Sequence, residues 1–168
     1  RTCTPTRHAA ATVDAKIDGH RTSRLYRAKL LKSEPVIRFS GQKLPNNPRI
    51  AVLANDAIGN FVATTPLMQM LRQSYSGADL HYFGGLRTKE LQDASDLADQ
   101  THNLLGPDST SQTRILLEHN STFDLTINVE QTPLTKVASS LLAKEEGFVC
   151  GPAMNAGGRG DLPFADDV

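Results

Sequence analysis

The chain has 168 residues, of which 39% are apolar and 21% charged, a composition typical of one globular domain and unlike a disordered or low-complexity chain. No apolar stretch approaches the ~18 residues of a membrane span, and two cysteines are too few for a disulfide scaffold. The net charge is zero, but residues 1–49 carry eleven Lys and Arg against three Asp and Glu, whereas residues 50–168 carry seven against fifteen. This asymmetry predicts a basic N-terminal arm, residues 1–48, ahead of an acidic globular part, residues 49–168.

The arm is polar and shows no strand periodicity up to residue 33. Residues 20–32, HRTSRLYRAKLLK, favour a short basic helix, and residues 34–40 favour a short strand. Three interpretations of the arm are open: it lies on an anionic membrane surface, binds nucleic acid, or docks on its own acidic domain. Aromatic side chains that stack on bases are nearly absent from it, which weakens the nucleic-acid interpretation.

The globular part begins with Ile50–Ala54, a continuous apolar run typical of a strand buried on both faces of a parallel sheet. A helix is predicted over 60–74, and Pro66 is expected to bend it or restrict it to a first turn. The remaining elements are predicted in the order strand 78–83, helix 88–97, a short element ending at 105, helix 111–120, strand 123–129, helix 133–144 and strand 147–150. This alternation predicts an α/β fold with a doubly wound parallel sheet and right-handed crossovers.

In such a sheet, ligands bind at the carboxyl ends of the strands, near the point where the strand order reverses. The first of these ends is the turn from Asn55 to Asn60, which contains one glycine, Gly59. It has neither the three glycines of a dinucleotide fingerprint nor the GK[ST] of a P-loop. The turn offers a close-approach glycine, a helix N-terminus and polar side chains. Alternatively, Asp56 and Asn60 simply cap the helix.

Two other strand ends carry polar groups. Glu130-Gln131-Thr132 follows the strand at 123–129, and its acidic and amide side chains suit hydrogen bonding to sugar hydroxyls, although a solvated loop fits the sequence equally well. Gly84-Gly85-Leu86-Arg87 follows the second strand and is either a place of close ligand approach or a simple strand exit. The five histidines are scattered along the sequence and predict no metal site.

The stretch Arg49–Arg72, RIAVLANDAIGNFVATTPLMQMLR, resembles the N-terminal signature of the heptosyltransferase-type glycosyltransferases, which add sugars to lipopolysaccharide cores. In that family a buried strand runs into a turn ending in Gly-Asp, and the following helix carries Thr-Pro, apolar residues and Arg. Further similar segments follow in the same order, at Ala78–Gly84, Phe123–Leu142 and Gly147–Gly151. The most specific of them is the Thr64-Thr65-Pro66 turn.

The resemblance implies the N-terminal, Rossmann-like half of a GT-B fold, in which this half receives the acceptor and a second domain holds most of the nucleotide-sugar donor. It further implies an inverting transfer of a heptose-like sugar to a lipopolysaccharide or surface-glycan acceptor, without a metal or other cofactor. The expected location is the cytoplasm, with the basic arm against the inner face of the cell membrane, and no nucleic-acid partner is expected. The family's general base is the carboxylate of the Gly-Asp turn.

This sequence departs from the family at that base, because Asn60 occupies the position of the aspartate and an amide does not accept a proton at neutral pH. Three possibilities are open: Asp56 substitutes as the base, Asn60 only orients the acceptor, or the base comes from elsewhere and catalysis is altered or lost. The resemblance places the following residues around the acceptor: Gly59, Thr64, Thr65, Glu130 and Gln131.

The chain ends about where the family's second domain would begin, so the 168 residues alone are not expected to catalyse transfer. The main alternative is a non-catalytic sugar- or nucleotide-binding α/β module, which the amide of Asn60 also fits. A second alternative is an unrelated flavodoxin-like regulatory domain.

Overall fold

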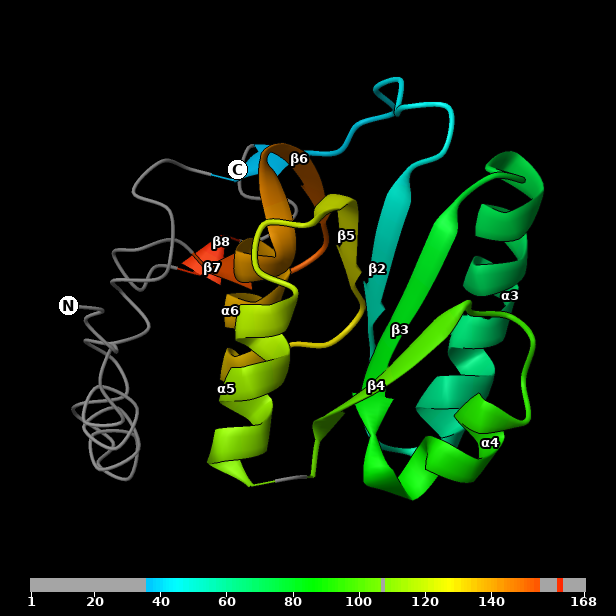
Figure 1. Ribbon diagram of the computed structural model, residues 1–168, viewed down its shortest axis with the longest axis vertical. Helices are drawn as coiled ribbons and strands as arrows, with labels where there is room; N and C mark the ends of the chain where they lie inside the picture. The colour runs from blue at the N-terminus through cyan, green and yellow to red at the C-terminus, as the bar shows by residue number, and fades with distance from the viewer. Residues whose placement is uncertain (1–35, 107, 155–159, 162–168) are drawn as a thin grey trace, which may run out of the picture.

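The computed structural model describes residues 36–106, 108–154 and 160–161 (Figure 1). Within them, six strands form a parallel sheet in the order β1-β6-β5-β2-β3-β4. The strands are β1 (Ile37–Arg38), β2 (Arg49–Leu53), β3 (Asp79–Gly85), β4 (Gln100–Leu105), β5 (Phe123–Asn128) and β6 (Ala143–Cys150). The helices are α3 (Ile58–Ser74), the 3-10 turn η1 (Leu86–Thr88), α4 (Lys89–Asp93), α5 (Ser109–Glu118) and α6 (Pro133–Leu142). A separate antiparallel pair joins β7 (Ala153–Met154) and β8 (Gly160–Asp161).

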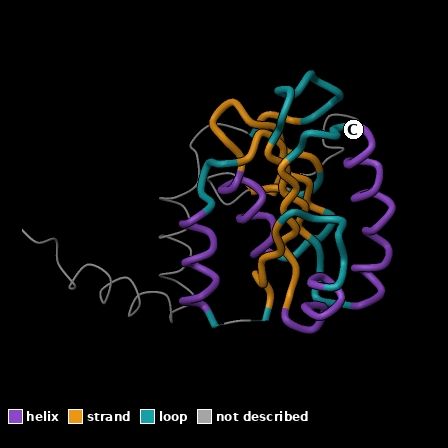
Figure 2. The backbone as a smooth tube through the Cα atoms, turned by 45° about the vertical axis from the view of Figure 1, so that its right-hand side comes forward, coloured by secondary structure: helices purple, strands orange, loops and turns teal. Residues whose placement is uncertain are grey.

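Helices cover both faces of the sheet, which confirms the predicted doubly wound, Rossmann-like α/β architecture (Figures 1 and 2). Alternate residues of the buried central strand β2 face opposite layers. Ile50 and Val52 pack in a core with Met68 and Leu71 of α3. Ala51 and Leu53 pack in a second core with Ala138 and Leu142 of α6. A strand whose two faces are both covered must be apolar throughout, which explains the uninterrupted run that the sequence shows.

The strand order reverses beside β2. The chain proceeds from β2 to β3 and β4 on one side, and then returns to place β5 and β6 on the other. The switch point therefore lies between β2 and β5, whose residues pair from Ile50 with Leu125 to Leu53 with Asn128. Because all six strands are parallel, their carboxyl ends meet at one edge of the sheet, which we call the carboxyl edge. This is the edge at which open α/β sheets bind ligands.

The N-terminal boundary of the folded part lies ahead of Arg49. Ile37 and Arg38 pair with Phe148 and Val149 of β6, so residues that the charge pattern assigns to the basic arm belong to the sheet. The predicted basic helix over 20–32 lies outside the described residues. Among the described helices, none combines the length and the apolarity that crossing a bilayer requires.

Pro66 does not restrict α3 to a first turn, because the helix continues through it to Ser74. Proline has no N–H for the carbonyl of Val62, four residues earlier. The Thr65 hydroxyl donates to that carbonyl at 2.8 Å, and the Thr64 hydroxyl donates to the carbonyl of Asn60 at 2.6 Å. A neighbouring side chain therefore replaces the missing backbone bond, and the helix keeps its length.

Three other elements differ clearly from the sequence prediction, while most of the remaining boundaries move by one or two residues. The element ending at Leu105 is a six-residue strand, β4. In place of the helix predicted over 88–97, the structure has the η1 turn followed by α4, which ends at Asp93. The Ser95 hydroxyl accepts the N–H of Leu97, and this local turn competes with continuation of the helix.

The third difference lies at the end of α6, which gives way to β6 at Ala143 rather than continuing to Lys144. The carbonyls of Leu141 and Leu142 accept the N–H groups of Ser121 and Thr122, which lie just ahead of β5. Because these carbonyls at the end of the helix are already paired with the sheet, the chain passes from helix to strand without a loop.

Candidate functional site

Asp56 lies at the carboxyl edge of the sheet and connects the loops that follow β2, β3 and β4. Its Oδ1 accepts the backbone N–H of Arg87 at 2.8 Å, at the start of the η1 turn. A Cβ added to Gly85 would lie 2.2 Å from the Asp56 Cγ, and one added to Gly106 would lie 3.5 Å from Oδ2. Gly85 therefore leaves the space that the carboxylate occupies, whereas a Cβ on Gly106 would only touch it, and one carboxylate oxygen is committed to holding the η1 turn.

The charge of Asp56 also reaches the interior of the sheet. Burial raises the pKa of the Tyr82 hydroxyl well above its ordinary value, and the negative charge of Asp56 raises it further. The Asp56 carboxylate therefore lies at the loops after β3 and β4, where its hydrogen bond and close contacts are.

The N-terminus of α3 is open. The residue at the cap position is Ala57, and no side chain caps the helix, so neither Asp56 nor Asn60 has the capping role that the sequence left open. Ala57, Ile58, Gly59 and Asn60 are exposed, and a Cβ added to Gly59 would meet nothing within 4 Å. Free backbone N–H groups at a helix N-terminus favour anionic and polar ligands. The first turn of α3 therefore offers unshielded donors beside the Asn60 amide.

Thr64 and Thr65 lie farther along α3, and their hydroxyls are bonded to carbonyls of their own helix. Thr64 is buried, and Thr65 is half-buried. Both hydroxyl hydrogens are committed to holding the helix together around Pro66.

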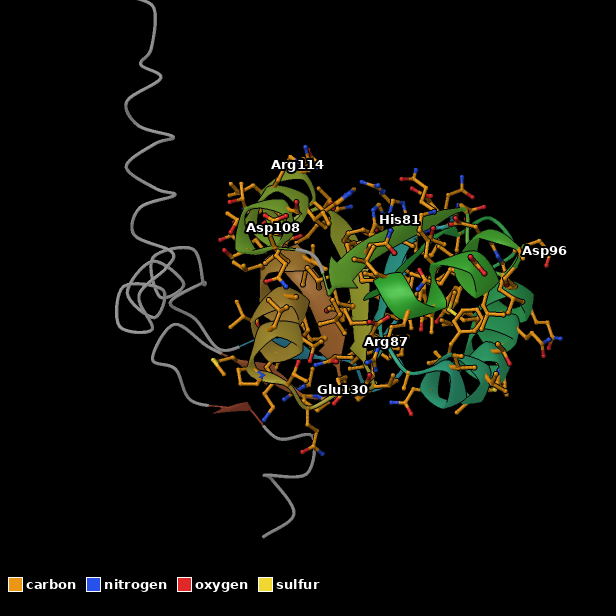
Figure 3. All side chains as sticks on the ribbon, turned by 90° about the horizontal axis from the view of Figure 1, so that it is seen from below. His81, Arg87, Asp96, Asp108, Arg114 and Glu130 are labelled. Carbon is orange, nitrogen blue, oxygen red and sulfur yellow. The ribbon has the colours of Figure 1, made fainter. Side chains whose placement is uncertain are left out.

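Glu130 and Gln131 follow β5, on the other side of the switch point from β3. Glu130 is half-buried, its N–H donates to the side chain of buried Asn128 at 3.0 Å, and its Oε1 accepts the N–H of Gln131 at 2.8 Å. The Gln131 side chain is exposed. Viewed toward the carboxyl edge, Glu130 and Arg87 project from different loops at this end of the molecule (Figure 3). The structure thus places two exposed amides after two adjacent strands, Asn60 in the first turn of α3 after β2 and Gln131 in the loop after β5.

Sequence reasoning missed the partners of Asp56. The backbone of Arg87 and the space above Gly85 lie 31 and 29 positions away, so no local spacing could reveal them. The Gly84-Gly85 pair was the available signal, because a glycine at a strand exit permits close approach of another group. The approaching group in this structure is the Asp56 side chain.

A second group of polar side chains lies on the α5 face of the sheet, near the amino-terminal ends of the strands. His81 of β3, His102 of β4 and His119 at the end of α5 come together, although they are far apart in the sequence. The rings of His81 and His102 are stacked with centroids 5.1 Å apart, and those of His102 and His119 are 4.4 Å apart. Phe83 and Phe123 pack against them. We call these three histidines the histidine cluster.

The histidine cluster resists protonation. Burial, together with the positive charges that neighbouring His119, His81 and Arg49 can carry, lowers the pKa of His102 to about 3. Burial also lowers the pKa values of His81 and His119. For Asp79, burial acts to raise the pKa, but hydrogen bonds from His81 and Arg49 outweigh it and the pKa is lowered.

Acid should therefore destabilise the protein through His102. In the unfolded chain this histidine binds a proton below about pH 6.5, whereas in the folded chain it stays neutral down to about pH 3. The unfolded state binds more protons in that range. The contribution of neutral His102 to the stability of the folded state is therefore complete above about pH 6.5 and decreases as the pH falls. Because His102 is partly exposed, we expect a loss of about 1 kcal/mol between pH 7 and pH 5.

Urea unfolding at pH 7 and pH 5, with a chelator present, measures this effect. His102→Gln should remove most of the pH dependence, and His20→Gln, outside the histidine cluster, should leave it unchanged. An equal pH dependence in the wild type and His102→Gln would contradict the assignment.

No protein-family model matches the sequence, and no curated protein matches it significantly. Among solved structures, the fold is similar to that of a glycosyl transferase of family 9 from Veillonella parvula, with a TM-score of 0.52 and 19% sequence identity. The match covers 61% of this chain and 31% of that protein, so the chain spans about a third of its length. A weaker match is S. aureus TarJ, with a TM-score of 0.38 and 12% identity over 70% of this chain and 41% of that one. The first likeness supports the Rossmann-like fold.

Proposed function

We propose that this chain is the acceptor-binding half of a glycosyltransferase that transfers a sugar from a nucleotide-sugar donor to a lipopolysaccharide or other surface-glycan acceptor. The observation that carries the proposal is the open first turn of α3, which follows the central strand beside the switch point and presents Asn60 to solvent. The similarity of the fold to a family 9 glycosyl transferase supports the same function. A heptose-like sugar and a location at the inner face of the cell membrane remain predictions from the sequence.

In this proposal the two candidate catalytic residues have different roles. Asn60 is exposed, so its amide can orient an acceptor hydroxyl by donating and accepting hydrogen bonds. Asp56 has one oxygen bonded to the Arg87 N–H and its carboxylate packed over Gly85, so it holds the η1 turn in place. A base must reach the proton that it removes, and both Asp56 oxygens lie at the loops after β3 and β4, Oδ1 on the Arg87 N–H and Oδ2 near Gly106. Asn60 therefore orients the acceptor, and the proton is taken by a group other than Asp56.

Acceptor binding tests the site directly on the 168-residue chain. Titrating the isotope-labelled chain with a lipopolysaccharide core oligosaccharide should shift the amide signals of residues 55–60 and 130–131 first. Asn60→Ala should weaken binding about tenfold, the effect of about one lost hydrogen bond to a ligand. Asn46→Ala, an exposed asparagine ahead of β2, is the matched control and should bind normally. Signal changes confined to other parts of the sheet would contradict the proposed site.

Transfer is measured on a protein in which this chain is followed by a donor-binding domain. Asn60→Asp should raise turnover at least tenfold, because a carboxylate at this exposed position can act as a general base and such catalysis contributes about 10²–10⁴-fold. Asp56→Asn should leave turnover within a few fold, since the amide oxygen still accepts the Arg87 N–H. If Asp56→Asn abolishes transfer instead, Asp56 is the base.

The non-catalytic sugar-binding module is the second candidate, and the amide of Asn60 favours it. It predicts the same oligosaccharide binding, but no transfer in either the wild type or Asn60→Asp. The two assays together therefore separate a binding module from a transferase.

A further inference from the structure

The histidine cluster has the donor set of a metal site. One ring nitrogen from each of His81, His102 and His119 lies within 4.8 Å of the others. His81 is fully buried, whereas His102 and His119 are half-buried, so the group is accessible from one side. We propose that these three imidazoles bind a divalent transition-metal ion of the zinc class. This site lies toward the amino-terminal ends of β3 and β4, away from the carboxyl edge, and it is independent of the proposed glycosyltransferase function.

The orientation of His81 supports the proposal. Its Nδ1 lies 2.9 Å from Nε2 of His102, and its Nε2 lies 3.0 Å from Oδ2 of Asp79. A carboxylate only accepts hydrogen bonds, so the contact with Asp79 favours the tautomer with hydrogen on Nε2, whereas the donor-only guanidinium of Arg49, 3.2 Å from the same nitrogen, opposes it. We assign the hydrogen to Nε2 because the Asp79 contact is the shorter one, which leaves the lone pair of Nδ1 directed toward His102. A metal-binding histidine whose second nitrogen donates to a carboxylate is the usual arrangement around zinc.

Metal binding also requires a proton to move. In the metal-free cluster, one hydrogen lies between His81 Nδ1 and His102 Nε2, and with His81 protonated on Nε2 that hydrogen belongs to His102. When the ion binds, this hydrogen bond breaks and two metal–nitrogen bonds take its place. The proton on Nε2 of His102 is released to solvent while Nδ1 of the same ring takes one up, so His102 remains neutral in its other tautomer.

The required rearrangement is small. Tetrahedral zinc with nitrogen ligands at 2.0–2.1 Å holds neighbouring nitrogens about 3.3 Å apart. His81 and His102 therefore need to separate by a few tenths of an ångström from 2.9 Å, while the third nitrogen moves inward. His119 is suited to that movement because it caps the C-terminus of α5 and is partly exposed. Water is the natural fourth ligand on the exposed side.

The charges around the histidine cluster are balanced. Arg49 opposes a cation, since its Nη2 lies 3.2 Å from Nε2 of His81. The same arginine donates through Nε to Oδ2 of Asp79 at 2.8 Å, so a carboxylate offsets its charge. The C-terminal end of α5 adds partial negative charge beside His119.

Cobalt and zinc binding to the full, chelator-treated chain tests the site. We expect one Co²⁺ per chain with the strong visible absorption of a tetrahedral ion and without a thiolate charge-transfer band, because no cysteine takes part. Zn²⁺ should displace it and Mg²⁺ should not, since imidazole suits the former ion and oxygen ligands the latter. His119→Gln should weaken binding at least tenfold. Asp79→Asn should weaken it 10–100-fold, as loss of a carboxylate partner does at other metal sites.

The control is the double variant His8→Gln/His20→Gln, which changes the two histidines outside the cluster and should bind normally. Circular dichroism checks that each variant is folded. If His102→Gln or Asp79→Asn does not fold, Co²⁺ binding by His119→Gln decides the test, because the His119 side chain is partly exposed. Absence of Co²⁺ binding, a thiolate band, or normal binding by folded His119→Gln would overturn the proposal. If Co²⁺ does not bind, the three histidine rings are only a packed aromatic group.

Discussion

Gly151→Ala should lower the free energy of unfolding by more than about 3 kcal/mol, the range of severe substitutions. Gly151 has φ +86°, a backbone conformation that favours glycine, and an added Cβ would lie 2.0 Å from the backbone oxygen of Asn128. That oxygen belongs to the last residue of β5, whose Asn128 side chain also donates to the carbonyl of Pro152 at 2.7 Å. The carbonyl of Gly151 itself accepts from the guanidinium of Arg38. Neither the backbone at Gly151 nor that at Asn128 can move aside without breaking these contacts.

Urea unfolding measures the loss, and Gly41→Ala is the matched control. Gly41 has φ +93°, close to that of Gly151, but a Cβ there would meet nothing within 4 Å. Its substitution therefore reports the backbone strain alone, about 1 kcal/mol. If the two variants lose the same amount, the close approach of Asn128 contributes nothing and the expected effect is wrong.

Gly85→Ala should cost about 2–4 kcal/mol for a different reason. Its φ of −136° is accessible to any residue, so there is no backbone strain. The added Cβ would lie 2.2 Å from both Cγ and Oδ1 of Asp56 and 2.5 Å from its Cβ. Asp56 must then leave its place, and the bond from the Arg87 N–H is lost. The cost combines overpacking with a broken hydrogen bond to a charged group.

A double-mutant cycle separates these contributions. In an Asp56→Gly background the obstructing side chain is absent, so Gly85→Ala should cost less than about 1 kcal/mol, and the coupling energy should be at least about 1 kcal/mol. Gly59→Ala serves as the control, since its Cβ meets open space within a helix and should stabilise the chain by about 0.5 kcal/mol. Additive losses for Gly85→Ala and Asp56→Gly would show that the two positions do not interact.

The sequence predicted the sheet well because its central strands have unambiguous patterns. A strand with both faces covered is apolar at every position, as Ile50–Ala54 is, and no surface helix has that pattern. The strand β4, QTHNLL, is polar because it lies at the edge of the sheet, and only its last residues show an apolar signal. The continuation of α3 beyond Pro66 depends on a hydroxyl of one threonine, which propensities do not describe.

The candidate sites were less predictable because contacts between distant residues create them. The turn after β2 could be identified from the position of ligand sites in α/β sheets, but the direction of the Asp56 side chain depends on a glycine in another strand. The histidine cluster depends on register. Pairing places Phe83 opposite His102 and His81 opposite Gln100, so the two histidines become diagonal neighbours on one face. No separation along the sequence indicates this.

The way in which β6 joins the sheet limits where this domain can vary in length. No loop separates Leu142 from Ala143, and the pairing of β6 with β5 is irregular up to Phe148, where five steps along β6 lie opposite two steps along β5. Phe148 packs with the core on the α3 face, whereas Val149 is buried in a separate group with Ala143 and Ala153. Because side chains alternate along a strand, one extra residue within the regular part of β6, from Phe148 on, would exchange these two positions and reverse the orientation of the strand toward the sheet's two layers. Length changes should therefore be tolerated in the irregular part of β6, before Phe148, and excluded after it.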